Sequence, residues 1–150
     1  MIGWVHERGE NMRMARVVAR GEGCYHVISR IAGQQFLLDG EEKDRALRTL
    51  VASAAFSGVE VLTFALMDNH FHLLVRVPRA RVVDDAELVS RMRSLHGDAK
   101  VERILHDWET WERKGLGFKV LDAKAALRRR MFDLSQFCKT LKETYSMSYN

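Results

Sequence analysis

The chain has 150 residues, 47% of them apolar, which is enough for one folded core and too many for a disordered chain. Its net charge of +4 excludes a polybasic chain, but the charge is unevenly distributed. Residues 1–112 carry fifteen basic and seventeen acidic side chains, whereas residues 113–150 carry nine basic and three acidic ones, a net charge of +6. We therefore expect a positive face in the last quarter of the chain.

The two cysteines, Cys24 and Cys138, stand far apart, which favours neither a disulfide framework nor a cysteine zinc site. The longest apolar runs are much shorter than a membrane-spanning helix. Charged residues close to the start argue against a signal-peptide core. These features predict a cytoplasmic protein that does not enter a membrane.

In chain order, residues 1–22 are predicted to form an arm before the first strand. Residues 24–32 alternate polar and apolar side chains, which indicates a half-buried strand. Asp39, with Glu42 three residues later, predicts the start of a helix that Gly58 ends.

Two further strands are predicted over residues 59–67 and 70–77, separated by Asp68 and Asn69, a pair that suits a tight hairpin. Pro78 ends the second of these strands because it cannot donate a ladder hydrogen bond. The first part of the chain therefore reads strand, helix, strand, strand.

The remaining residues predict helices. One begins at Asp84 or Asp85 and ends at Gly97, a second runs from there to a break at residues 115–117, and the last begins near Asp133. Trp108 and Trp111, in the second of these helices, could stack on bases or pack in a core, and their helical stripe favours the core.

The segment from His70 to His72 is the part of the sequence that indicates chemistry. In a strand, both imidazoles emerge on one face while Phe71 points to the other, and two adjacent imidazoles can bind one metal ion. The alternative is a pair of ordinary polar residues on a solvated sheet face.

Four segments carry a family resemblance: residues 23–30, 56–61, 67–74, and 132–142 together with Tyr149-Asn150. In this order and spacing the chain resembles the REP-associated tyrosine transposases, a branch of the HUH single-strand endonucleases. The resemblance implies an α+β fold: a ferredoxin-like antiparallel sheet with a β-α-β-β core and added C-terminal helices. It divides the chain into the arm (1–22), the transposase-like sheet core (23–78) and a helical basic region (79–150).

The resemblance further implies that His70 and His72 hold a divalent metal, Mg²⁺ or Mn²⁺. Imidazole suits manganese better than magnesium, so the metal stays open. The expected activity is nicking and joining of single-stranded or hairpin DNA, with a tyrosine oxygen attacking a phosphodiester polarised by the metal. A 5′-phosphotyrosyl link and a free 3′-hydroxyl would result.

The family's nucleophilic tyrosine lies in a helix with a Tyr-Ile pair and an Asn-Pro-Val motif, and that helix usually supplies the third metal ligand. Neither motif is present here, so the chain is expected to stop before that helix and to be incomplete for catalysis. One alternative is a DNA-binding remnant that no longer cuts. Another is a metal hydrolase unrelated to DNA, for which His26 is the available further ligand.

Tyr145 and Tyr149 are the tyrosines near the C-terminus that could substitute as nucleophiles. Tyr145 falls on an apolar stripe with Cys138 and Leu141, which favours a core position. Tyr149 matches a non-catalytic position of the family.

The candidate DNA contacts are basic side chains, for which the alternatives are a solvated helix face or structural ion pairs. The oligomeric state, monomer or homodimer, stays open. The candidates are Arg30, Lys124, Arg128, Arg129, Arg130, Lys139 and Lys142.

Overall fold

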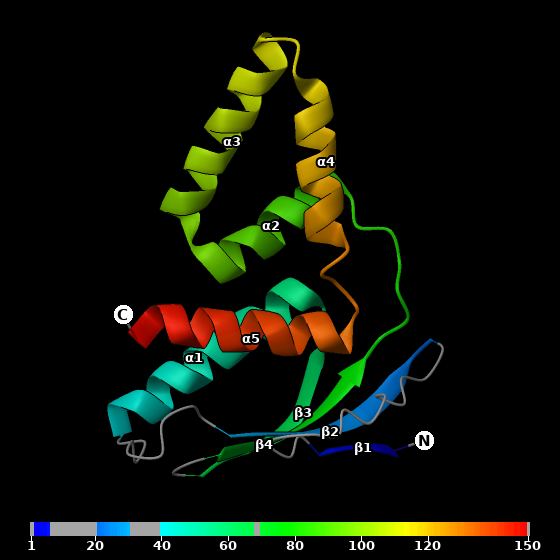
Figure 1. Ribbon diagram of the computed structural model, residues 1–150, viewed down its shortest axis with the longest axis vertical. Helices are drawn as coiled ribbons and strands as arrows, with labels where there is room; N and C mark the ends of the chain where they lie inside the picture. Colours follow the sequence, from blue (N-terminus) through cyan, green and yellow to red (C-terminus); the bar gives the residue numbers. More distant parts are fainter. Residues whose placement is uncertain (1, 7–20, 31–39, 68–69, 150) are drawn as a thin grey trace, which may run out of the picture.

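The computed structural model describes residues 2–6, 21–30, 40–67 and 70–149 (Figure 1). The described part of the first half contains two strands, one helix and two further strands, and helices alone follow, so the predicted α+β class is confirmed. The elements are β1 (Ile2–His6), β2 (Gly23–Arg30), α1 (Gly40–Ser57), β3 (Glu60–Leu66), β4 (His70–Val77), α2 (Asp85–His96), α3 (Asp98–Arg113), α4 (Gly117–Arg128) and α5 (Leu134–Tyr149).

The four strands form one sheet in the order β1-β2-β4-β3. β4 pairs antiparallel with both β2 and β3, which gives the expected β-α-β-β core. Residues 2–6 differ from the expected arm, because they form β1 and pair in parallel with β2. This pairing occupies the edge of β2 that would otherwise carry open hydrogen-bonding groups.

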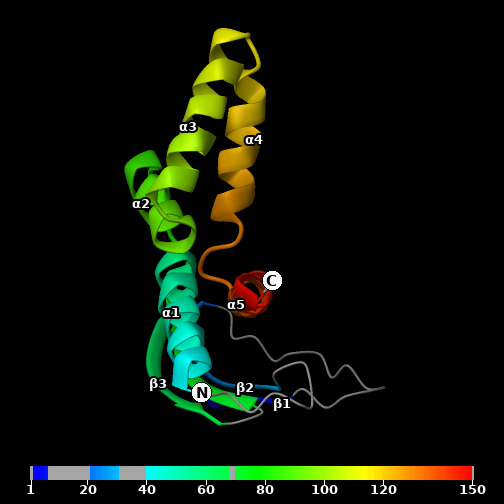
Figure 2. The same ribbon diagram turned by 90° about the vertical axis from the view of Figure 1, so that its left-hand side faces the viewer.

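Helices α1 and α5 lie together on one side of the sheet (Figure 2). Alternate side chains of β2 and β4 point to these helices and form the first core with α5, because successive strand residues face opposite sides of a sheet. This core comprises Tyr25, Val27, Leu50, Val59, Leu73, Val75, Val77, Leu134, Phe137 and Leu141.

A second core lies among α2, α3 and α4, of which α3 and α4 extend away from the sheet as a helical hairpin (Figure 1). Phe56, near the end of α1, is fully buried in this second core, so α1 supports both clusters. Trp108 is 7% exposed and Trp111 packs against the same cluster, which confirms the predicted core position of both.

The predicted helix ends agree with the local geometry. Gly58 and Gly97 take φ angles of +69° and +76°, in the left-handed region that glycine enters without strain. The Asp84 carboxylate accepts a hydrogen bond from the Glu87 amide at 2.8 Å and caps α2. The predicted cap at Asp39 and the Asp68-Asn69 turn lie outside the described residues, but the Met67 amide donates to the His70 carbonyl at 2.9 Å, as in a hairpin.

Across the part of the chain that the structure describes, no helix is both long and apolar enough to cross a membrane.

Candidate metal centre on the outer face of the sheet

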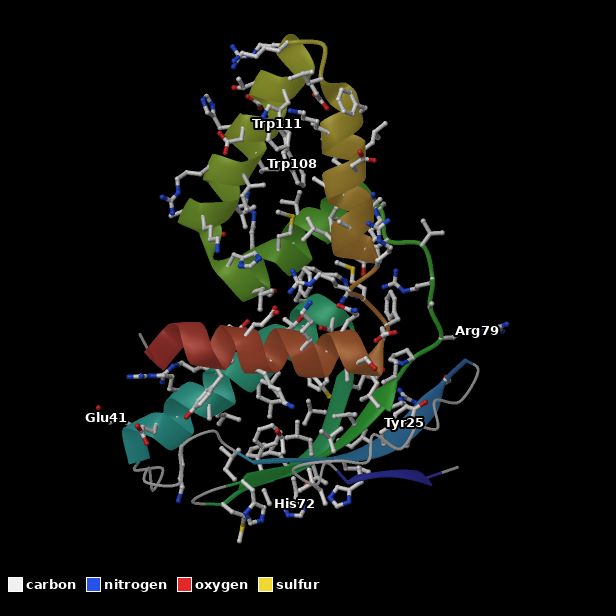
Figure 3. All side chains as sticks on the ribbon, viewed as in Figure 1. Tyr25, Glu41, His72, Arg79, Trp108 and Trp111 are labelled. Atoms are coloured by element: carbon white, nitrogen blue, oxygen red, sulfur yellow. The ribbon has the colours of Figure 1, made fainter. Side chains whose placement is uncertain are left out.

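His70 and His72 lie on the face of the sheet turned away from α1 and α5, here called the outer face. Their neighbours Phe71 and Leu73 point to the first core, so the alternation of β4 places both imidazoles on the other side. Both histidines are partly exposed. Figure 3 shows His72 projecting from the sheet on the side opposite α5. The predicted common face of the two histidines is therefore present.

A third imidazole, His26 of β2, joins them. His26 Nε2 lies 3.0 Å from His72 Nδ1, within hydrogen-bonding distance. From the sequence, His26 was considered only as a ligand of an unrelated hydrolase, and its contact with His72 was missed. The sequence feature that could have placed His26 on the outer face is the alternation of β2, in which His26 stands between the inward-pointing Tyr25 and Val27.

The other two imidazoles affect His72 electrostatically. The pKa of His72 is lowered by burial, and further by the nearby His26 and His70. A lowered pKa favours the neutral form of the His72 imidazole. The neutral ring retains a nitrogen lone pair, which a metal ligand requires.

The spacing of His70 and His72 suits a shared metal ion. Their ring centroids are 5.0 Å apart and their planes meet at 67°. With a nitrogen-to-metal distance of about 2.1 Å, two imidazoles bound side by side to one ion have centroids about 4.6–5.3 Å apart. Within the described residues no three His, Cys, Asp or Glu side chains form a ready metal-binding group.

The other end of the outer face carries Arg76, whose charge is neutralised. Its guanidinium contacts Glu60 at 2.6 Å and Glu22 at 3.4 Å. Arg76 therefore holds β3 and the start of β2 to β4 through ion pairs.

The structure does not bring Tyr25 or Tyr145 to the histidines. Tyr25 is 3% exposed and belongs to the first core. Tyr145 lies one helical turn after Leu141, on the side of α5 that packs toward the face of the sheet opposite the histidines. Its pKa is raised by burial and further by Glu42 of α1. A raised pKa disfavours the phenolate. The side chain of Tyr149 lies outside the described residues.

Three of the cations predicted to contact DNA make contacts within the protein. Lys124 and Arg128 of α4 bind the Asp85 carboxylate at 2.7 and 2.6 Å, and Arg128 Nε also donates to the Val83 carbonyl at 2.8 Å. Arg130 donates to Thr140 Oγ1 at 3.0 Å. These contacts fasten α4 to α2 and the segment before α5 to α5.

The other predicted cations are distributed differently. Arg129 and Lys142 are exposed, and exposed Lys139 lies 3.8 Å from Glu143 on the same helix. Arg30 ends β2 with its backbone opposite His70, and its side chain is outside the described part. Lys124 and Arg128 lie on α4, which is separated from the sheet by α1 and α5 (Figures 1 and 2). The structure therefore does not gather these two cations around the histidines.

β4 presents His-x-His on one face of the sheet, has an antiparallel partner on each side, and is covered by helices on the other face. This is the arrangement of the antiparallel core that the sequence resemblance implied. A family model described as "Transposase IS200 like" matches residues 21–113, from before β2 to the end of α3. This match spans more than half of the chain and includes His26, His70 and His72. The chain therefore belongs to the IS200-like transposase family, which implies DNA as its partner. Neither the curated proteins nor the solved structures gave a match.

Proposed function

We propose that this chain binds a divalent metal, Mg²⁺ or Mn²⁺, through His70 and His72, and places a phosphodiester of single-stranded or hairpin DNA on the outer face. The observation that carries this proposal is the pair of partly exposed imidazoles with centroids 5.0 Å apart. Because β4 is hydrogen-bonded to a strand on each side, the two rings stand on a rigid element, as a preorganised site requires.

When bound, the ion would polarise the phosphodiester and neutralise the negative charge that builds up during attack on phosphorus. The protein's contribution is to hold the two imidazoles close enough together to bind one ion. The lowered pKa of His72 serves this role because a protonated ring could not bind the metal.

The nucleophile in this proposal is a tyrosine oxygen. The phenol loses its proton as its oxygen forms an ester with phosphorus, the bond between phosphorus and the 3′ oxygen breaks, and the departing 3′ oxygen takes up a proton to become a free 3′-hydroxyl. Tyr25 and Tyr145 lie on the face of the sheet opposite the histidines, which argues against either of them as the attacking tyrosine.

The same placement of the tyrosines favours a second candidate function: a DNA-binding protein that recognises hairpin or single-stranded DNA without cutting it. The two functions share the outer face and differ in whether a covalent link to DNA forms. A covalent adduct is therefore the property that separates them.

The test uses end-labelled hairpin DNA with Mn²⁺ and the wild-type protein, the His70→Ala/His72→Ala double variant, and His106→Ala as a matched control from the exposed surface of α3. A covalent adduct on a denaturing gel that is lost in the double variant supports the nuclease. A metal-dependent shift on a native gel without an adduct supports the non-cutting protein. If the double variant behaves like wild type in both gels, the histidines take no part in DNA handling.

A further inference from the structure

We propose that His26 is a positioning residue: through its hydrogen bond to His72 Nδ1, it directs His72 Nε2 to the metal. This inference rests on the proposed metal site at His70 and His72. It concerns which nitrogen of His72 binds and what holds that ring in place.

The strand register explains how His26 reaches His72. His72 stands directly opposite Ile28, and His26 stands opposite Leu74, so the two histidines are diagonal neighbours on the outer face. Diagonal positions in an antiparallel pair are about 7–8 Å apart, which aromatic side chains can bridge. The rings close this gap to 3.0 Å between His26 Nε2 and His72 Nδ1.

The ring geometry is that of a hydrogen bond made in the ring planes. Each ring nitrogen lies about 1.2 Å from the centre of its ring, so an in-line bond of this length separates the centroids by about 5.3 Å. The observed centroid separation is 5.1 Å, and the planes differ by 25°. The two nitrogens therefore point at each other, which leaves no room for an ion between them and assigns His26 a supporting role.

The direction of this hydrogen bond decides whether His72 can bind metal. If His72 Nδ1–H donates to His26 Nε2, the lone pair of His72 Nε2 remains available. In the reverse arrangement a neutral His72 carries its proton on Nε2 and has no lone pair for the ion. Metal binding thus requires His26 as the acceptor, in the way that metal-binding histidines generally donate their second ring N–H to a fixed partner.

The contact also restricts rotation of the His72 ring. Loss of such a supporting partner typically lowers metal affinity by about 10- to 100-fold. His70 meets His72 at 67° between their planes, so a ring of His72 that turns freely would lose the spacing of the pair.

The test is a calorimetric titration of Mn²⁺ into the full chain. Compared with wild type, His26→Ala should bind about 10- to 100-fold more weakly. His26→Gln, whose Oε1 can accept at the place of Nε2, should recover most of the affinity. Cys24→Ala, from the same strand, is the matched control and should bind like wild type. Wild-type Mn²⁺ affinity in His26→Ala would overturn the inference. If His26→Ala does not fold, a folded His26→Gln whose Mn²⁺ affinity stays well below that of wild type would overturn it.

Pulsed electron paramagnetic resonance of the bound Mn²⁺ counts the coordinated imidazoles. Two are expected in both wild type and His26→Gln. Three in wild type and two in His26→Gln would show that His26 is itself a ligand and would refute the positioning role. Failure of the underlying site gives another pattern, because the His70→Ala/His72→Ala variant would then bind Mn²⁺ as wild type does.

Discussion

Replacing Gly58 by alanine should destabilise the protein because this residue ends α1 in a crowded left-handed turn. Gly58 has a φ of +69°, and a Cβ there would lie 2.6 Å from Phe132 Cε1 and 3.0 Å from Arg91 Nη1. The left-handed backbone costs an L-residue about 1–2 kcal/mol. Forcing a methyl group into a filled site adds about 1–3 kcal/mol.

Phe132 cannot withdraw easily from this added methyl group. Its amide donates to the Ser57 carbonyl at 2.8 Å, and its ring lies beneath the guanidinium groups of Arg81 and Arg91, 5.5 and 5.4 Å from the centroid. The backbone and packing costs together give an expected loss of about 2–5 kcal/mol in the free energy of unfolding.

Urea unfolding followed by circular dichroism measures this loss. Gly115→Ala is the matched control, because Gly115 ends α3 with a φ of +73° and a Cβ added there would meet nothing within 4 Å. The control should lose about 1–2 kcal/mol, the backbone cost alone. Equal losses in the two variants would refute the packing argument, and no loss in either would refute the backbone argument as well.

Three further predictions concern charged and aromatic groups. The pKa of Glu87 is lowered to about 2 by hydrogen bonds from Arg81 and Arg91, so its ionised form stabilises the fold above pH about 5, an effect lost as the pH falls to about 2. The difference in melting temperature between wild type and Glu87→Gln should accordingly shrink between pH 5 and 2, and a constant difference would contradict it. Arg128→Ala should lower the free energy of unfolding by about 1 kcal/mol through its lost contacts. Arg129→Ala should leave the melting temperature unchanged and, if Arg129 binds phosphate, reduce the salt slope of single-stranded DNA binding by about 0.7. Equal melting temperatures of the two variants would refute this division of roles. Tyr145→Phe should give the same gel pattern with hairpin DNA and Mn²⁺ as wild type, and loss of a wild-type adduct would place this phenol in the reaction.

Local sequence patterns predicted the elements that carry the site. The alternation around Phe71 placed His70 and His72 on one face, and β4 spans residues 70–77 as expected. Gly58 and Gly97 marked helix ends because their backbone conformations favour glycine. These features depend on neighbours in the chain, which a sequence displays directly.

Contacts between distant residues were not predictable in this way. The bond between His26 and His72 joins residues 46 positions apart and depends on the register of β2 against β4. The pairing of Lys124 and Arg128 with Asp85 depends on the packing of α4 against α2. From the sequence, these cations were assigned to DNA, and their ion pairs with Asp85 were missed because this carboxylate lies far away along the chain. β1 was missed for a similar reason, since its parallel partner lies beyond an intervening segment.

The central claim, that His70 and His72 bind a divalent metal, is tested most directly by calorimetric titration of Mn²⁺ into wild type, the His70→Ala/His72→Ala variant and the His106→Ala control. We expect one Mn²⁺ bound per chain in wild type and in the control, and loss of that binding in the folded double variant. Mn²⁺ binding by the double variant with wild-type affinity would contradict the claim.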